Sequence, residues 1–201
     1  RASAAGSFLA GALALLAAAG LASAPAAIVP LVAVFFAAAA ASGLALQVSA
    51  GLRGPRAYAR YASAVDGADW DGWCDLFTDD CIYRLVPREN HERGLPLATL
   101  AFESKGMLKD RAHAIRETLF HDPCYQRHVV GVPLVLRVDG DRIDCEAHYA
   151  VFRTKLSALT TVFNVGRYLD TVVRTAHGLR FASRLAIYDS EMIPNSIIYP
   201  I

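Results

Sequence analysis

Four long runs in the C-terminal half of the chain alternate between apolar and polar residues. The runs cover residues 127–138, 142–156, 162–175 and 179–190. In the second run, Ile143 and Cys145 flank Asp144, which follows the two-residue period of a half-buried β-strand. Asp-Gly at 139–140 and His-Gly at 177–178 suit tight turns between runs. The pattern predicts four strands of unusual length, which are expected to be strongly twisted and curved.

Two segments before these strands carry apolar residues at helical intervals instead. The first has a stripe through Trp70, Trp73 and Phe77, and Asp69 is suited to cap its N-terminus. A tryptophan pair in this position anchors a core more often than it lines a ligand pocket. The second segment covers residues 107–119 and has its charged residues on the opposite side. We expect a helix in each segment.

Shorter elements complete the expected architecture. Residues 56–65 favour a helix, residues 81–86 and 97–104 favour short strands, and residues 87–94 are polar and rich in turn formers. Helices followed by a curved antiparallel sheet predict an α+β fold, with a mostly antiparallel sheet wrapped around N-terminal helices as a cone. A cone of this kind can enclose a cavity.

The first quarter of the chain differs in composition from the rest. Between Arg1 and Arg53 there is no ionisable side chain, whereas all 19 acidic residues lie further on. The apolar run 26–46 has the length of a membrane-spanning helix. We expect an Ala-rich apolar helical segment at residues 1–52 and a separate domain at residues 53–201. A membrane anchor, the tail of a fused protein and a gene-model artefact all stay open for the first part.

Charge and cysteine content narrow the function classes. From Arg56 onward the basic residues are scattered among acidic ones, which argues against a nucleic-acid partner. The cysteines are too few and too irregularly spaced for a disulfide framework or a zinc module. Buried, reduced thiols in a cytosolic protein are the simplest interpretation. The four cysteines are Cys74, Cys81, Cys124 and Cys145.

Motifs of the common catalytic classes are missing from the sequence. It contains no Gly-rich phosphate loop, no Gly-x-Ser-x-Gly and no His-Glu-x-x-His. Cys145 and His148 form a Cys-x-x-His, half of a Rieske iron–sulfur motif, but the Cys-x-His half is absent. Positions three apart on a strand face opposite sides. We therefore expect a buried thiol beside a surface histidine at this place.

The segment 121–128 holds residue types that can bind iron. His121, Asp122 and His128 are the ligand types of a mononuclear ferrous site. A usable site needs three groups that converge from fixed positions, which a short loop seldom provides alone. An ordinary polar connection between helix and strand is the preferred interpretation.

Acid–base chemistry inside the cone is a further alternative. Cones of helices and curved sheet elsewhere host enzymes with Asp–His or Tyr–Asp arrangements in the cavity. Asp80, Tyr83 and His148 are the residues here that could serve. The carboxylates mostly occupy positions that are expected to face outward, and no histidine is expected to point inward. Acid–base chemistry therefore stays open without direct support.

Several segments, taken in order, resemble one known family. They are Asp69–Tyr83, Asn90–Gly94, Arg111–Arg116, Tyr125–Gly131 and Asp189-Ser190. Residues 56–201 resemble the small, or beta, subunit of bacterial aromatic-ring-hydroxylating dioxygenases, which are Rieske non-haem iron oxygenases. The stretches 88–97 and 119–123 are more similar to the small subunits of salicylate, anthranilate or terephthalate oxygenases than to those of biphenyl or naphthalene enzymes.

The resemblance implies an NTF2-like, or cystatin-like, cone that assembles with a large alpha subunit, commonly as alpha3beta3 with homotrimeric contacts among beta subunits. In that family the Rieske 2Fe-2S cluster and the mononuclear iron lie in the alpha subunit. The beta subunit is mainly structural and modulates substrate preference in some members. We therefore expect no catalytic, cofactor or metal residue in this cytoplasmic chain, and an aromatic acid as the substrate of the complex.

Under this reading the important residues are interface residues. Interfaces preferentially bury aromatic and arginine anchors. The candidates, each of which could instead be a core or rim residue, are Tyr125, Arg127, Arg167, Tyr168 and Tyr199. The apolar ending at residues 197–201 is expected to dock on its own sheet or on a neighbour.

Two other hypotheses belong to different classes. A stand-alone acid–base enzyme of the same fold, such as a dehydratase or isomerase, would need a ligand-sized cavity with a carboxylate or histidine at its base. A domain attached to a membrane protein would need the run 26–46 to cross a bilayer.

Overall fold

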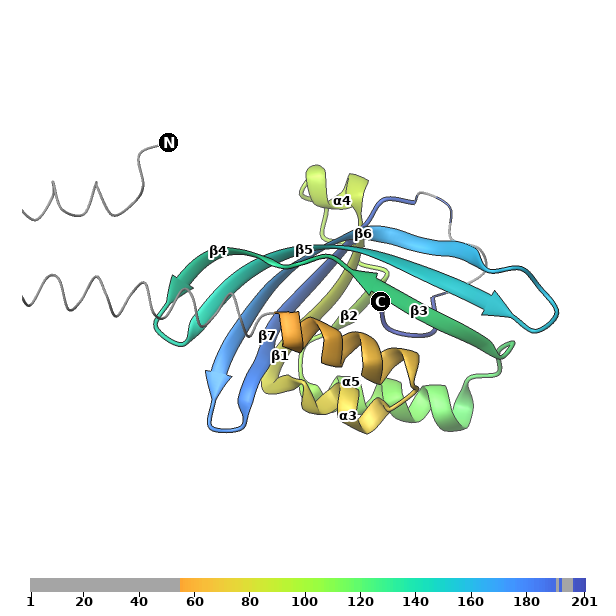
Figure 1. The fold of residues 1–201 in the computed structure, drawn as a ribbon, viewed down its shortest axis with the longest axis horizontal. Helices are drawn as coiled ribbons and strands as arrows, with labels where there is room; N and C mark the ends of the chain where they lie inside the picture. The colour runs from red at the N-terminus through yellow and green to blue at the C-terminus, as the bar shows by residue number, and fades with distance from the viewer. Residues whose placement is uncertain (1–54, 191, 193–196) are drawn as a thin grey trace, which may run out of the picture. The chain divides into compact units, whose positions relative to one another are not determined.

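A curved sheet carries its longer helices on one face, as the α+β prediction required, whereas one short helix lies apart from them (Figure 1). The computed structural model describes residues 55–190, 192 and 197–201. The predicted segment 1–52, its boundary and its apolar run 26–46 lie outside these residues. Within the described part of the chain, no helix is both long enough and apolar enough to cross a membrane.

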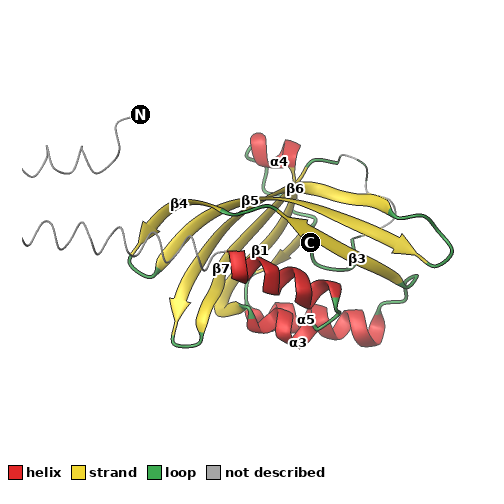
Figure 2. Cartoon of the chain, viewed as in Figure 1, coloured by secondary structure: helices red, strands yellow, loops and turns green. Residues whose placement is uncertain are grey.

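Figure 2 distinguishes the helices (red) from the strands (yellow); along the chain, the first two strands lie between helices, and the other five strands follow without a helix between them. A helix at residues 55–66 precedes all the labelled elements. The labelled elements are α3 (Trp70–Asp75), β1 (Phe77–Pro87), α4 (Arg88–Glu92), β2 (Leu100–Phe102), α5 (Lys105–His113), η2 (Ala114–Thr118), β3 (Cys124–Val130), β4 (Leu134–Asp139), β5 (Arg142–Lys155), β6 (Thr161–Thr175) and β7 (Gly178–Tyr188).

The seven-stranded sheet has the order β2-β1-β7-β6-β5-β3, and β4 also pairs with β5. Every pairing is antiparallel except that of β1 with β7, which is parallel. The β4–β5 and β6–β7 turns contain Gly140 and Gly178 with φ of 57° and 102°. Glycine adopts such positive φ values without a steric penalty, and the two predicted turns are confirmed.

The predicted helix at residues 70–77 is confirmed at its start and wrong at its end. The Asp69 side chain accepts a hydrogen bond from the Gly72 backbone N–H, as an N-cap does. The helix ends at Asp75, and Phe77 already pairs with Phe181 of β7. The strand predicted at residues 81–86 therefore begins earlier, and a register shift between Phe77 and Ile82 accommodates the two aspartates there.

The single strand predicted at residues 127–138 is instead two strands, β3 and β4. Both pair with β5, but the ladder is interrupted at residues 131–133. Gly131 still donates to the His148 carbonyl at 2.8 Å. Pro133 has no N–H to donate and breaks the ladder.

Other predicted elements differ in extent. The helix expected at 107–119 begins at Lys105 and widens into the π-helical turn η2. The strand expected at 97–104 shrinks to the three residues of β2. The stretch 87–94 contains the one-turn helix α4 where only turns were expected. These short elements depend on tertiary contacts more than on their own sequence.

A buried ion pair lies at the centre of the core. Asp170 of β6 and Arg184 of β7 face each other across the ladder and form two hydrogen bonds of 3.1 and 2.7 Å. Both side chains have 0% exposure. Burial alone would lower the pKa of Arg184, but the Asp170 carboxylate raises it well above its ordinary value. Rings surround the guanidinium and belong to Tyr58, Tyr61, Tyr168 and Phe181.

The end of the chain docks on its own domain, as one of the two predicted alternatives stated. The Ile201 carbonyl accepts hydrogen bonds from the hydroxyls of Tyr61 and Tyr83, and the Ile201 N–H donates to Tyr83. Arg111 of α5 donates to the carbonyls of residues 197 and 198. Ile201 is fully buried and therefore fills part of the interior.

We predict that Asp170→Ala lowers the free energy of unfolding by about 3–5 kcal/mol, because Arg184 then keeps a buried charge without a partner. Urea denaturation followed by circular dichroism measures this loss. Replacing both members, Asp170→Leu with Arg184→Met, is expected to recover most of the lost stability.

Glu103→Ala is the matched control for this experiment. It breaks the solvent-exposed pair of Glu103 with Arg84, which has an N–O separation of 3.4 Å. Such pairs contribute about 0–1 kcal/mol. Equal destabilisation by Asp170→Ala and Glu103→Ala would contradict the central role of the buried pair.

Candidate functional site

A second buried polar pair joins the first helix to β3. Asp66 accepts from the His128 backbone N–H at 2.9 Å and from the imidazole Nδ1 at 2.6 Å. The side chains of Asp66 and His128 are 5% and 0% exposed. The expectation that no histidine points inward was therefore wrong. The alternating exposure along β3 places His128 on the inner face, because Tyr125 and Arg127 take the outer positions.

The Asp66–His128 pair has the composition of an acid–base dyad. In such dyads the carboxylate orients the imidazole, and the far ring nitrogen exchanges the proton. Here the far nitrogen, Nε2, is buried without a hydrogen-bond partner, and the ring lies edge-on to Tyr61 with centroids 6.2 Å apart. The pair therefore holds the helix to the sheet, while its imidazole lacks contact with solvent.

The residues weighed for acid–base work do not meet. Asp80 and His148 are exposed, whereas Tyr83 is fully buried and binds Ile201. Two of the buried polar groups, Asp170 and Arg184, neutralise each other. The interior thus contains polar side chains, but tyrosine rings and the end of the chain fill the space around them.

The suggested metal motifs are not assembled either. Cys145 is buried and His148 exposed, as expected for positions three apart on a strand. His121 binds the Tyr199 hydroxyl through Nε2 at 2.8 Å, whereas His128 binds Asp66. Within the described residues, no group of three or more His, Cys, Asp or Glu could hold a metal ion.

Three of the predicted interface residues occupy outward-facing positions of the sheet, and the guanidinium of one of them, Arg127, also lies 3.8 Å from the Asp66 carboxylate of the first helix. Tyr125 is 78% exposed, and the Arg127 side chain is 75% exposed. Arg167 of β6 lies opposite His148 on the same face and has its guanidinium 3.3 Å from Glu146. The outer face is thus accessible to a partner at each of these positions.

The other two interface candidates are placed differently. Tyr168 is 0% exposed and stacks on Tyr149 with ring centroids 4.2 Å apart. It is a core residue, so its suggested surface role is corrected. Tyr199 is partly buried and packs against Trp70, with ring centroids 5.2 Å apart. It lines a small pocket together with Phe120.

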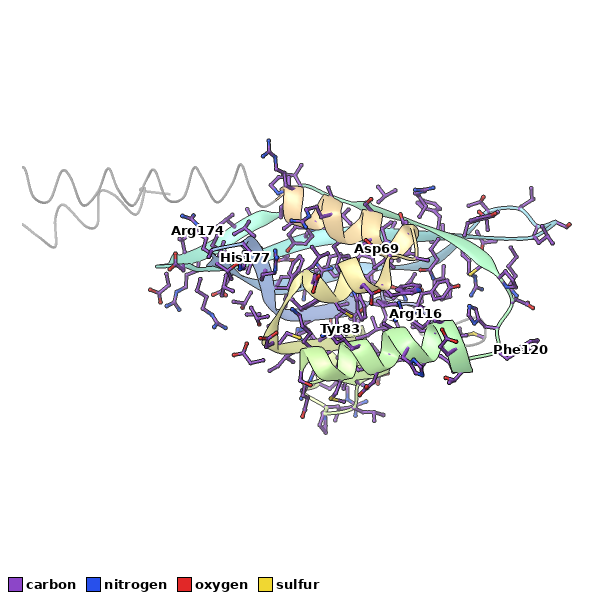
Figure 3. All side chains as sticks on the ribbon, turned by 90° about the horizontal axis from the view of Figure 1, so that it is seen from below. Asp69, Tyr83, Arg116, Phe120, Arg174 and His177 are labelled. Atoms are coloured by element: carbon purple, nitrogen blue, oxygen red, sulfur yellow. The ribbon has the colours of Figure 1, made fainter. Side chains whose placement is uncertain are left out.

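A pocket of about 180 Å³ opens beside Tyr199. We call it the mouth pocket. Figure 3 shows Phe120, one of its lining residues, at the end of the molecule opposite Arg174 and His177. The residues that give the mouth pocket its character are Phe120, Gln126, Arg153, Lys155, Phe163 and Tyr199. Sequence reasoning missed it, because its members come from four separate segments.

Charge in the mouth pocket is partly cancelled. The Lys155 ammonium lies 2.6 Å from the Asp122 carboxylate, and the hydrogen bond from Lys155 lowers the pKa of Asp122. Arg153 instead places its guanidinium over the Phe163 ring, 4.2 Å from the centroid. The pocket therefore keeps one positive charge beside an aromatic face.

A second groove of about 530 Å³ runs between the first helix and the β3–β4 edge. Its walls include Tyr58, Ala62 and Val132, and Asp66 and His128 also line it. The groove shows where the buried pair comes nearest to the surface.

Comparison with known proteins gives this scaffold a family. The SnoaL-like domain family matches residues 55–185. The anthranilate 1,2-dioxygenase small subunit of Burkholderia cepacia is 35% identical over 143 residues, which cover 71% of this chain and 88% of the relative. The chain belongs to the small, or beta, subunits of the aromatic-ring dioxygenases. The resemblance found in the sequence is thus confirmed.

Further relatives support the same family assignment. Beta subunit 1 of the terminal oxygenase component of terephthalate 1,2-dioxygenase from Comamonas sp is 32% identical, with 71% of this chain and 93% of the relative covered. A solved structure from Novosphingobium aromaticivorans, assigned as the beta subunit of an aromatic-ring-hydroxylating dioxygenase, has 34% identity and a TM-score of 0.71. The match covers 78% of this chain and 99% of the other. The NTF2-like fold expected for this beta subunit is confirmed.

We predict that the beta subunit reacts slowly with a disulfide reagent at neutral pH. Burial raises the pKa of Cys74, Cys81 and Cys145 to about 11 and also raises that of Cys124. At pH 7 a thiol with a pKa of about 11 is ionised in about one molecule in ten thousand. The labelling rate should therefore increase as the pH rises toward 11.

Cys124 serves as the internal comparison in this experiment, because it is partly exposed whereas the other three cysteines are buried. It should react first, and unfolding in urea should release all four thiols. Mass spectrometry of labelled peptides gives the order. Fast labelling of Cys145 in the folded protein would contradict the burial described here.

Proposed function

We propose that this chain is the assembly subunit of a multicomponent aromatic-ring dioxygenase and does no chemistry itself. It provides contacts for a large subunit that carries the Rieske cluster and the mononuclear iron. The relatives named above are small subunits of anthranilate and terephthalate dioxygenases, which supports an aromatic acid as the substrate of the complex. An alpha3beta3 assembly with contacts among the small subunits is part of this proposal.

The observation that carries the proposal is an apolar strip on the outer face of the sheet. The strip crosses three neighbouring strands, because Arg127 of β3 pairs with Phe152 of β5, and Phe152 pairs with Val162 of β6. Exposures along it reach 78% for Tyr125, 56% for Val129 and 59% for Val162. We define the outer strip as Tyr125, Val129, Phe152 and Val162.

An outer strip of this kind is unusual for a sheet face in water. The solvent side of a half-buried antiparallel sheet normally carries polar residues. Contiguous apolar side chains rimmed by charged ones are typical of a protein contact. Arg127 and Arg167 supply charged neighbours on the same face, and arginine and tyrosine are enriched among the residues that anchor interfaces.

The free edge of the sheet continues this surface. On and beside β4, the side chains of Val132, Leu134 and Leu136 are 86%, 62% and 53% exposed. An uncovered apolar edge strand invites association with another chain. The edge therefore supports contacts among copies of the small subunit, next to the outer strip that we assign to the large subunit.

We predict that Tyr125→Arg and Val162→Lys each reduce co-purification with the large subunit by about tenfold or more, because both put a charge into a desolvated contact. The assay is co-expression with an oxygenase large subunit that carries Cys-x-His and Cys-x-x-His motifs. Affinity capture is then followed by iron analysis of each chain.

Leu97→Lys is the matched control, because Leu97 is 72% exposed but lies outside the outer strip. It should leave co-purification unchanged. Sedimentation of the wild-type protein alone and with the large subunit gives the stoichiometry. A wild-type chain that stays monomeric beside the large subunit, or that binds iron stoichiometrically on its own, would overturn the proposal.

A further inference from the structure

The mouth pocket contains a positive charge that no carboxylate neutralises. Among the described residues, Arg153 has no ion-pair partner, and its contact is with the Phe163 ring at 4.2 Å. The neighbouring Lys155 is already paired with Asp122. A half-buried guanidinium beside an aromatic ring suits an anion, since its fork of N–H donors matches a carboxylate.

Opposite Arg153 lies an acceptor without a donor. Gln126 is 6% exposed, and its Oε1 is buried without a hydrogen-bond partner in the described part of the protein. A buried carbonyl oxygen left in this state destabilises the protein unless a ligand or water supplies a donor. Gln126 thus supplies a hydrogen-bond acceptor to the pocket, in addition to the Arg153 charge.

The sheet register places these two groups side by side. Gln126 of β3 and Arg153 of β5 are direct cross-strand partners on the inner face. Side chains in that relation start about 5 Å apart. A ligand that binds both groups therefore presents a carboxylate and a hydrogen-bond donor within one small molecule.

Size and lining point to a single aromatic ring. The pocket holds about 180 Å³, and a cavity of about 150 Å³ in another protein is enough for benzene. Its apolar lining includes the rings of Phe163 and Tyr199, and the fully exposed Phe120 borders it. Aromatic rings favour offset or edge-on contact with another aromatic ring.

We propose that the mouth pocket binds a small aromatic carboxylate with a hydrogen-bond donor on the adjacent ring carbon. Arg153 holds the carboxylate, and Gln126 accepts from the donor. The small subunit then senses an aromatic acid at its own site. This site is separate from the outer strip and does not depend on the proposed assembly role.

The test is a titration of the purified full-length chain, without a large subunit, with three probes. The probes are 2-aminobenzoate, 4-aminobenzoate and benzoate. Isothermal titration calorimetry measures the dissociation constant of each. We expect 2-aminobenzoate to bind with a dissociation constant below about 1 mM and about fivefold or more tighter than either of the others. Equal binding of the three probes, or no binding at millimolar concentration, overturns the proposal.

Variants separate the two contacts. Arg153→Gln should weaken the binding of 2-aminobenzoate by about tenfold or more, because a charge-assisted hydrogen bond is lost. Gln126→Leu should abolish the preference for 2-aminobenzoate over 4-aminobenzoate while the carboxylate contact is kept. Arg142→Gln removes the same charge from the opposite end of β5 and is the matched control.

Thermal melts of each variant show whether it is folded. If Gln126→Leu does not fold, Arg153→Gln and the comparison of the three probes still decide the question. Equal weakening by Arg142→Gln and Arg153→Gln would show a general effect of charge and would overturn the proposed site.

Discussion

A guanidinium buried among aromatic rings must be neutralised in place, and the pairing of Asp170 with Arg184 does this at the centre of the cone. The pair joins β6 to β7, and Tyr58 and Tyr61 of the first helix complete its surroundings. Helix and sheet are therefore positioned around one charge. Because the Tyr61 hydroxyl also donates to the Ile201 carbonyl, the same cluster fixes the position of Ile201 in the interior.

The sequence was most informative where a pattern is repeated over many residues. The alternation along 142–156 predicted β5 almost to the residue, since one face of that strand meets the core along its whole length. The predicted boundaries of helices and strands were wrong where two neighbouring elements have the same local pattern. Phe77 fits a helical stripe, but pairing with Phe181 places it in a strand, and Pro133 breaks a run that alternates on both sides of it.

The sites were harder to predict because they depend on contacts between distant residues. Asp66 and His128 are 62 positions apart, and neither has a neighbour in the sequence that suggests the pair. Gln126 and Arg153 meet only because β3 takes one particular register on β5. The interface candidates differ in exposure, since aromatic type alone does not distinguish the exposed Tyr125 from the buried Tyr168.

The parallel pairing of β1 with β7 has a consequence for how the protein is made. These strands are neighbours in the sheet, yet all the elements from α4 to β6 lie between them in the chain. During synthesis, β1 leaves the ribosome long before its partner exists. Until then β1 can pair only with the three residues of β2, so the complete sheet forms only after its last strand has been made.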